Sequence, residues 1–381
     1  MSVPKARAAS SLSSTFSSEK PAAAGFRLSW RGMSAHPDLV PPAAVLAAFD
    51  LEPTSLVRAT SGLMNPTWFA SSRSGAPLVL QRVNPIFSAE VNTDIAAVTT
   101  HLASKGLLTP RLVPTSDGGL WFEHDGVWRV LTRIEGICRD ALETPAQAGA
   151  AGRLVAQFHR AVSDLDHRFR NRRLGVHDTP RHLRTLRELL VEQRGHRHFG
   201  VIEPLAERVL ETAAALPPLP AGPDRIVHGD PKISNLMFAP DTDRALCLID
   251  LDTLAHMPVA LELGDALRSW CNPATEDAAS ARFVRPFFDA AIGGYAEAAQ
   301  GFLTAAEWSA IPRGALTITV ELAARFCADA LRESYFGWNR ARYESSSAHN
   351  QARTYGQLQL AEGIRAELAA LEDMTAKAFG G

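Results

Sequence analysis

The feature that most constrains the fold is a change of sequence pattern near residue 135, where segments with strand-like patterns are followed by segments with helical spacing. Before this point, β-branched and aromatic runs occur in two pairs: 67–72 with 77–83, and 119–124 with 127–134. Asp125-Gly126 joins the second pair, and this dipeptide readily adopts the positive φ angles of a tight hairpin turn. We therefore predict two β-hairpins in the N-terminal part.

Helices and a further strand are predicted around these hairpins. Apolar residues at helical spacing predict a helix over 89–102, PAAVLAA suggests a short helix at 42–48, and 56–62 is expected to add a strand. After residue 136 helical spacing dominates, with two short strands at 235–239 and 245–253. The predicted helices of this part are 144–165, 181–194, 204–215, 282–300, 315–333 and 351–378.

Three regions follow from this pattern. Residues 1–35 are rich in Ser and Ala and are expected to form a disordered tail, or to precede a true start at Met33. Residues 36–135 are expected to form an N-lobe with a small antiparallel sheet and one packed helix, and residues 136–381 a larger, mainly helical C-lobe. The predicted fold class is α+β.

Composition excludes several classes of protein. With 46% hydrophobic residues the chain can build real cores, and its formal charge of −2 attracts neither nucleic acid nor an anionic membrane. The four cysteines are scattered without a C-x-x-C pair, which argues against a zinc site or a disulfide framework. No apolar run is long enough to span a membrane. We expect a cytoplasmic protein whose partner is a small molecule.

The densest group of chemistry-bearing residues lies in HGDPKISN (228–235) and IDLD (249–252). Asp230 and Asn235 lie close along the chain, and strand alternation after LCLI predicts that Asp250 and Asp252 face one space. Oxygen ligands of this kind suit Mg²⁺, which usually binds together with substrate phosphates. The hypothesis is a phosphoryl transfer in which Asp230 accepts the proton of an attacking hydroxyl while Asn235 and Asp250 hold the metal; for Asp252, a second metal ligand and a structural acceptor remain equal alternatives.

These two segments resemble the catalytic loop and the metal-binding segment of the aminoglycoside phosphotransferase and choline kinase superfamily, distant relatives of protein kinases. The resemblance implies a two-lobed protein-kinase-like fold and ATP as co-substrate. Within this superfamily the sequence is similar to N-acetylhexosamine 1-kinase-like enzymes, in segments such as LVLQRVNPIF, WRVLTRIEG, LGDALRSW and RFCADALRESYF. That branch transfers the γ-phosphate of ATP to the anomeric 1-hydroxyl of a free sugar. An aminoglycoside, choline or amino-alcohol kinase and a catalytically silent nucleotide-binding module are the alternatives.

The resemblance also assigns nucleotide-binding residues, with departures. Many relatives grip the α- and β-phosphates with a lysine on the third strand, but the only lysines here are 5, 20, 105, 232 and 377. Gln81 or Arg82 must replace that lysine, and the alternation of the strand leaves open which of them faces the nucleotide. The phosphate-covering loop has one glycine, Gly62, and would rely on Asn65 and Thr67. In relatives, a carboxylate on the N-lobe helix pairs with the basic residue that binds the phosphates. In this chain that carboxylate would be Glu90 or Asp94.

The remaining candidates concern the acceptor and the support of the loop. The resemblance suggests sugar binding by Arg325 with Asp329, although an ordinary i,i+4 ion pair explains them too. Tyr335 is a candidate stacking platform for the sugar, or a core residue. His228 is expected to shape the catalytic loop, and Asp265 to cap a helix or clamp that loop. Thr179 is expected to cap the helix after VHDTP, and Lys232 either neutralises the transferring phosphoryl group or is solvated.

Overall fold

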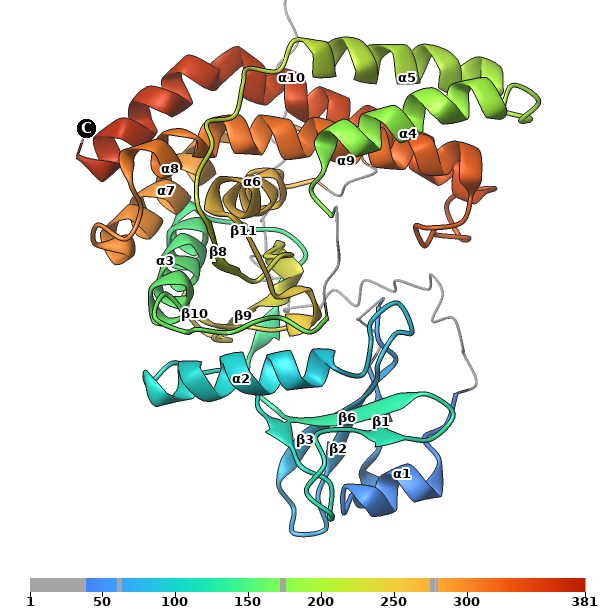
Figure 1. Cartoon of the computed structure of the whole chain (residues 1–381), viewed down its shortest axis with the longest axis vertical. Helices are drawn as coiled ribbons and strands as arrows, with labels where there is room; N and C mark the ends of the chain where they lie inside the picture. Colours follow the sequence, from blue (N-terminus) through green and yellow to red (C-terminus); the bar gives the residue numbers. More distant parts are fainter. Residues whose placement is uncertain (1–38, 60–63, 172–175, 275–277, 279, 381) are drawn as a thin grey trace, which may run out of the picture.

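Two lobes make up the molecule, with the six-stranded sheet in one and most of the helices in the other (Figure 1). The computed structural model describes residues 39–59, 64–171, 176–274, 278 and 280–380. The tail expected over 1–35 therefore lies outside the described residues, as does Gly62. Among the described residues, no helix is both long and apolar enough to cross a membrane.

The N-lobe is an antiparallel sheet in the order β1-β2-β3-β6-β4, with β5 paired to β6. Both predicted hairpins are confirmed, the second through a turn in which Asp125 and Gly126 have φ angles of 48° and 126°. The elements are α1 (Ala43–Ala48), η1 (Pro53–Ser55), β1 (Val57–Arg58), β2 (Thr67–Ser71), β3 (Pro77–Arg82), α2 (Val91–Ser104), β4 (Leu112–Val113), β5 (Phe122–Glu123) and β6 (Val127–Thr132).

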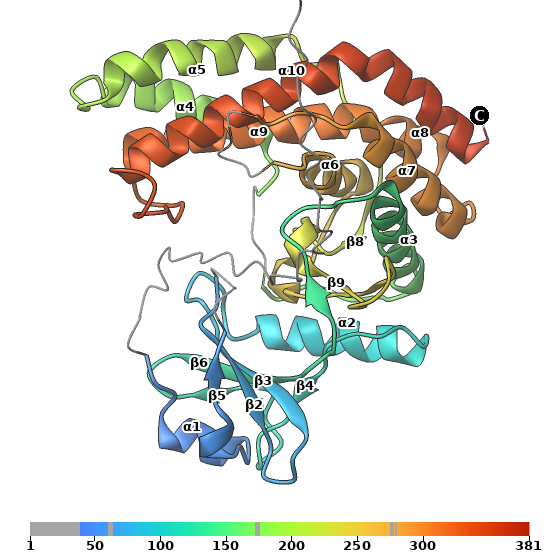
Figure 2. The ribbon, with the colours of Figure 1, turned by 180° about the vertical axis from the view of Figure 1, so that it is seen from behind.

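The two faces of this sheet differ in what they contact. Trp68, Leu80 and Trp128 belong to a core that α1 completes, on the face turned away from the C-lobe. Helix α2 lies on the other side, between the sheet and the C-lobe, as both views show (Figures 1 and 2). Because strand side chains alternate, the residues between these core positions point into the space between the lobes. The nucleotide-facing candidates can therefore be assigned by strand position alone.

The C-lobe is mainly helical and carries two small sheets, β10-β9-β7 and β11-β8. Its long helices pack in pairs, α3 with α7, α6 with α9 and α9 with α10. The elements are β7 (Ile137–Cys138), α3 (Pro145–Ala161), α4 (Thr179–Glu192), α5 (Phe199–Ala214), β8 (Asp224–Val227), η2 (Ile233–Asn235), β9 (Leu236–Phe238), β10 (Ala245–Leu248), η3 (Leu251–Thr253), β11 (Ala255–Pro258), α6 (Val259–Trp270), α7 (Arg285–Ala299), α8 (Ala305–Ser309), α9 (Ile311–Arg332) and α10 (Ser346–Phe379).

The predicted helices all exist, and their boundaries show which local signals misled. Helix α5 begins at Phe199, five residues before the predicted start, and contains Pro204. The N-cap of α4 is Asp178, whose Oδ1 accepts a hydrogen bond from the Arg181 N–H, so the predicted Thr179 cap is wrong. Helix α6 begins at Val259, which puts Asp265 in its middle; the predicted helix-capping role of Asp265 is wrong.

Adjacent glycines in α7 allow a test of the α3–α7 packing. A Cβ on Gly294 would overlap the carbonyl oxygen of Gly149, whereas a Cβ on Gly293 would meet no atom within 4 Å. We expect Gly294→Ala to lower the free energy of unfolding by about 1–3 kcal/mol through overpacking. Gly293→Ala, the matched control, should raise it by about 0.5–1 kcal/mol because alanine favours the helix. Urea unfolding of both variants measures the difference, and equal effects would show that the helices are not in close contact.

Candidate active site

The catalytic loop follows β8 and is shaped by a glycine. Gly229 has a φ of +84°, and a Cβ there would collide with the carbonyl oxygen of Thr253, so only glycine fits between His228 and Asp230. The Asp230 N–H donates to Nδ1 of His228, whose Nε2 lies 2.8 Å from the Ile249 carbonyl oxygen. These two bonds use the neutral imidazole with its proton on Nε2. His228 therefore shapes the loop, as predicted.

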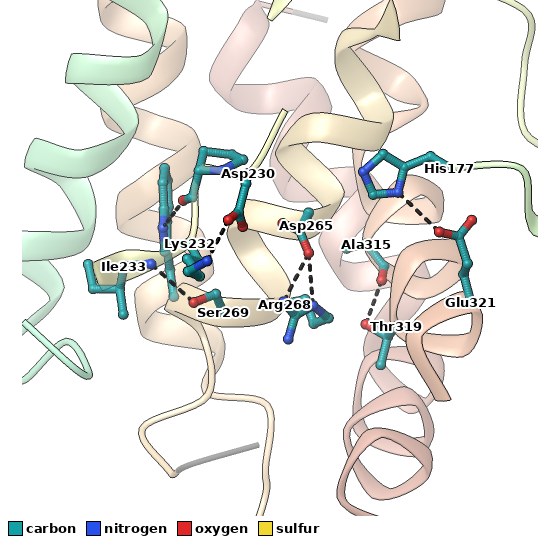
Figure 3. A network of polar contacts seen from close by, with 12 residues as sticks. His177, Asp230, Lys232, Ile233, Asp265, Arg268, Ser269, Ala315, Thr319 and Glu321 are labelled. Atoms are coloured by element: carbon teal, nitrogen blue, oxygen red, sulfur yellow. Dashed lines mark hydrogen bonds and ion pairs between the residues drawn. The ribbon is translucent and has the colours of Figure 1, made fainter. Parts of the chain in front are cut away.

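Side chains of helix α6 hold the backbone of this loop in place through hydrogen bonds, an arrangement called here the Glu262 clamp. One carboxylate oxygen of Glu262 accepts hydrogen bonds from the N–H groups of His228 (2.7 Å) and Gly229 (3.0 Å), and the other lies 2.5 Å from Nε2 of buried His159. Ser269 and Trp270 bind the backbone of the next residues, Ile233 and Pro231 (Figure 3). Sequence reasoning missed Glu262 and offered Asp265 for this role. Glu262, which holds the loop, lies on the same helix as Asp265, one turn earlier.

Asp230 follows Gly229 in this loop, and its side chain is partly exposed. Its Oδ2 accepts hydrogen bonds from Lys232 Nζ (2.5 Å) and Asn235 Nδ2 (3.1 Å), while no described residue donates to its Oδ1. One carboxylate oxygen is thus held and the other is free to accept a proton. Burial lowers the pKa of Lys232, but the carboxylates of Asp230, Asp250 and Asp265 outweigh it and raise that pKa above its ordinary value. Lys232 stays charged beside Asp230.

Asn235 and Asp250 both carry side-chain oxygen atoms to which no described residue donates a hydrogen bond. The Nδ2 group of Asn235 is committed to Asp230, which leaves its Oδ1 available, and the Asn235 backbone oxygen accepts from Ile249 N–H at 2.9 Å. Asp250 adopts a left-handed backbone with a φ of 61°, and no described residue donates a hydrogen bond to its carboxylate. Burial and the neighbouring charges of Asp252 and Asp230 raise the pKa of Asp250. A carboxylate in this state is stabilised by a cation.

The predicted strand alternation from Asp250 to Asp252 is wrong, because β10 ends at Leu248 and Leu251–Thr253 forms a 3₁₀ turn. Asp252, only 1% exposed, turns toward the N-lobe. Its two oxygens accept from both terminal nitrogens of Arg129, and Oδ2 also accepts from Asn65 Nδ2 at 2.6 Å. Both oxygens are occupied within the protein, which favours a structural acceptor over a metal ligand.

Gln81, not Arg82, faces the space between the lobes. Gln81 Oε1 accepts from Arg129 Nε (2.9 Å), and Gln81 Nε2 donates to Thr67 Oγ1 (3.2 Å). Arg82 lies on the opposite face, where it bonds the carbonyl of Asp125. Of the two alternatives, the one in which Arg82 binds the nucleotide phosphates is therefore wrong. Thr67, Gln81 and Arg129 are in register across β2, β3 and β6, so they form one polar row.

Neither predicted helix carboxylate pairs with a base on this sheet. Glu90 forms an ion pair with Arg170 at 3.0 Å, and buried Asp94 accepts from His167 and from the backbone N–H groups of Arg170 and Asn171. Both carboxylates hold the C-lobe segment that runs past α2, which corrects the prediction. Arg129 instead reaches Asn92 on α2, at 3.5 Å. Sequence reasoning missed Arg129, although a charged residue inside the apolar run VWRVLT was a usable signal.

Of the acceptor candidates, Arg325 lies near the site and Asp329 does not bind it. Asp329 is buried and accepts from the backbone N–H groups of Ser334, Tyr335 and Phe336, so it anchors the turn after α9. The expected i,i+4 pair of Arg325 with Asp329 is wrong. Arg325 lies 4.0 Å from Glu321 and over the ring of Tyr335, which is 57% exposed rather than in the core.

Glu321 organises a second polar group beside the catalytic loop. Its oxygens bind His177 Nδ1 (3.1 Å) and accept from Thr179 Oγ1 (2.6 Å). Burial lowers the pKa of His177, but the hydrogen bond and charge of Glu321 outweigh it and raise that pKa. Asp265 stands between this group and Lys232; burial raises its pKa, but Arg268, His177 and Lys232 together lower it (Figure 3). A cavity of about 200 Å³ lies here, bordered by Gly229, Thr253 and His177.

Comparisons with known proteins agree with this geometry. The family model of the phosphotransferase enzyme family matches residues 55–300, more than half of the chain, so the chain belongs to this family. It is an ATP-dependent kinase of small molecules with a protein-kinase-like fold.

Solved structures show the same fold at low identity. An aminoglycoside phosphotransferase from Alicyclobacillus acidocaldarius is 17% identical, with a TM-score of 0.54 over 90% of this chain and 99% of that one. An aminopropanol kinase associated with a microcompartment is 18% identical, with a TM-score of 0.55 over 86% and 97%. The amicoumacin kinase hAmiN, in complex with AMP-PNP, Ca²⁺ and Ami, is 12% identical, with a TM-score of 0.56 over 83% of this chain and 91% of that one.

The Glu262 clamp can be tested by removing its carboxylate. Glu262→Ala leaves two buried N–H groups of the catalytic loop without acceptors, and we expect the free energy of unfolding to fall by on the order of 3 kcal/mol. Glu297→Ala, which removes an exposed ion pair with Arg153, should cost less than about 1 kcal/mol. Chemical denaturation of both variants gives the comparison. Similar losses would contradict the clamp.

The raised pKa of His177 predicts a pH dependence of stability. Because the folded-state pKa lies above the unfolded value, the stabilisation from protonated His177 is complete below the unfolded value of about 6.5 and is lost as pH rises through the folded value. His177→Gln should therefore cost most stability at pH 5.5 and least at pH 8.5. Unfolding at these two pH values measures this, with the exposed His124→Gln as control. A cost that does not change with pH would refute the pairing.

Proposed function

We propose that this chain is an ATP- and Mg²⁺-dependent kinase that phosphorylates a sugar hydroxyl, most concretely the anomeric 1-hydroxyl of an N-acetylhexosamine or a related hexose. In this proposal residues 36–135 form the nucleotide-binding lobe and residues 136–381 the catalytic lobe. The observation that carries the choice of acceptor is that Asp230, Asp265 and Glu321, the carboxylates of the polar group beside the catalytic loop, are each paired with a cationic or imidazole side chain.

These carboxylates carry little spare negative charge. Asp230 pairs with Lys232, Asp265 with Arg268, and Glu321 with His177 (Figure 3). Arg325 lies 4.0 Å from Glu321. An ammonium group on an acceptor would need a carboxylate that lacks a cationic partner. A neutral sugar needs closely spaced donors and acceptors instead, and the paired side chains and the Thr179 hydroxyl offer both.

The N-lobe sheet offers a site for the nucleotide. Its interlobe face carries an apolar row in register across β1, β2, β3 and β6, next to the polar row of Thr67, Gln81 and Arg129. The apolar row lies nearer the connection between the lobes and consists of Val57, Phe69, Val79 and Leu131. We propose that the purine base packs on the apolar row and that the phosphates lie toward the polar row. Thr67, Asn65 and Gln81 remain candidate nucleotide contacts.

The donor set fits a hard divalent cation. Asn235 Oδ1 and the Asp250 carboxylate are oxygen ligands without competing donors among the described residues, and substrate phosphates and water complete such a set for Mg²⁺. No three His, Cys, Asp or Glu side chains gather as a metal site in the described part of the chain. Bound Mg²⁺ would neutralise charge on the nucleotide phosphates. The amicoumacin kinase complex, with AMP-PNP and Ca²⁺, supports a nucleotide with a divalent ion.

Asp230 would act as the proton acceptor. Lys232 and Asn235 fix its Oδ2, which leaves Oδ1 to accept the hydroxyl proton of the sugar as the sugar oxygen bonds to the γ-phosphorus, the bond from that phosphorus to the bridging oxygen breaks and ADP leaves. Lys232, held charged by its neighbours, would lie close to the phosphoryl group and stabilise its negative charge. Most of the catalysis would consist of positioning and charge stabilisation.

An amino-alcohol acceptor is the second candidate, because the aminopropanol kinase shares the fold over most of both chains. ADP release across a panel of free sugars, aminoglycosides, choline and aminopropanol separates the two. We expect N-acetylhexosamines or related hexoses to stimulate it most. Greater stimulation by an amine would replace the sugar proposal, and nucleotide binding without turnover on any acceptor would favour the silent module.

Asp230→Asn tests the proton acceptor. We expect kcat to fall by roughly 10²–10⁴-fold while ATP still binds, because the amide cannot take the proton. Asp241→Asn, an exposed change in the turn between β9 and β10, is the matched control and should leave kcat unchanged. A variant that keeps more than about a tenth of the activity would rule out this role for Asp230.

A further inference from the structure

The two lobes meet at a buried ion pair that neither the resemblance nor the family assigns. Arg129 on β6 and Asp252 in η3 are each only 1% exposed. Both terminal nitrogens of the guanidinium donate to Asp252, one of them at 2.9 Å to Oδ2. A buried charge pair of this kind is stable only when its remaining hydrogen-bonding groups are satisfied.

Here the remaining groups are satisfied by residues of the N-lobe. Gln81 Oε1 accepts from Arg129 Nε and Nη2 at 2.9 and 2.8 Å, and Asn92 accepts from Nη1 at 3.5 Å. Asn65, which belongs to the predicted phosphate-covering loop, donates to Asp252 at 2.6 Å. The donors of Arg129 are thus all engaged within the protein. A direct grip on the phosphates would require breaking these bonds.

Asp250 lies between this ion pair and the catalytic loop. On one side, Ile249 is bound through its N–H by Asn235 and through its carbonyl by His228. On the other side, Asp252 is fixed by Arg129 and Asn65. The left-handed backbone of Asp250 is uncommon for a residue other than glycine, and the bonds on both of its flanks hold it in place.

We propose that Arg129 is a positioning residue for the metal: by holding Asp252 it fixes the turn that aims the Asp250 carboxylate at a divalent cation. Asp252 is then the anchor of this turn and does not bind the metal. The charged pair that relatives build from a strand lysine and a helix carboxylate is replaced by one that joins the sheet to the metal-binding segment. This inference rests on the proposed nucleotide and metal site.

Direct binding of Mn²⁺ as a probe, followed by electron paramagnetic resonance in the presence of ADP, tests the proposal. Arg129→Gln removes the anchor and leaves the Asp252 carboxylate in place. We expect the Mn²⁺ affinity to fall by about 10-fold, the scale of effects on residues that orient metal ligands. If Asp252 were itself a ligand, releasing it from Arg129 would keep or raise the affinity, which would overturn the proposal.

Binding of ADP and adenosine without metal, in EDTA, separates positioning from a phosphate grip. Positioning predicts that Arg129→Gln leaves both affinities unchanged. A selective loss of ADP affinity would show that Arg129 binds phosphate and would overturn the proposal. Arg73→Gln, which breaks an exposed ion pair with Asp50 in the same lobe, is the matched control and should change none of these values.

Arg129→Lys covers the case in which Arg129→Gln does not fold. Lysine keeps the charge next to Asp252 but cannot bind Asp252 and Gln81 together, so we expect a several-fold loss of Mn²⁺ affinity with a normal melting transition. Wild-type Mn²⁺ affinity in every folded Arg129 variant would overturn the proposal. Failure of the wild-type protein to bind Mn²⁺ with ADP would instead contradict the proposed function.

Discussion

The organisation of the site depends on buried charges that are satisfied across long distances in the sequence. Glu262 on helix α6 accepts hydrogen bonds from the backbone N–H groups of His228 and Gly229 in the catalytic loop, and Arg129 neutralises Asp252 from the opposite lobe. An unpaired charge in either position would be costly, so each pair fixes the geometry of the segment it touches. Asp230, Asn235 and Asp250 lie between these two constraints.

The parts of the site predicted from the sequence are those that are contiguous in it. HGDPKISN keeps Asp230 and Asn235 close because they are only five residues apart, and Asp250 is expected with them because it directly follows the apolar run LCLI. The spacing of apolar residues and the turn residues predicted the two hairpins, the helix between them and the helical C-lobe. These features depend on local spacing and turn residues, which a single sequence displays directly.

The remainder could not be predicted because it depends on register and on packing between distant elements. Arg129 enters the site only because β6 pairs with β3 so that Arg129 stands opposite Gln81. Glu262 is marked by nothing local, since a glutamate inside a helix is ordinarily solvated. Asp329 and Glu90 looked like binding residues, but the turn after α9 and the loop beside α2 use their carboxylates. The type of a residue alone does not show whether its side chain binds a substrate or stabilises a neighbouring turn.

The connection between the lobes limits how they can move. Strand β6 ends at Thr132, and β7 begins at Ile137 by pairing with β9, the strand that follows the catalytic loop. Four residues, 133–136, therefore connect the two strands, and the Arg133 N–H still donates to the Pro77 carbonyl of β3. Four residues keep the end of β6 within roughly 17 Å of the start of β7. Helix α2 shares a core with the C-lobe, and Arg129 is paired with Asp252, so the N-lobe is tied to the C-lobe at three places. Any movement of the sheet about the connector would have to carry α2 with it or break the Arg129–Asp252 pair.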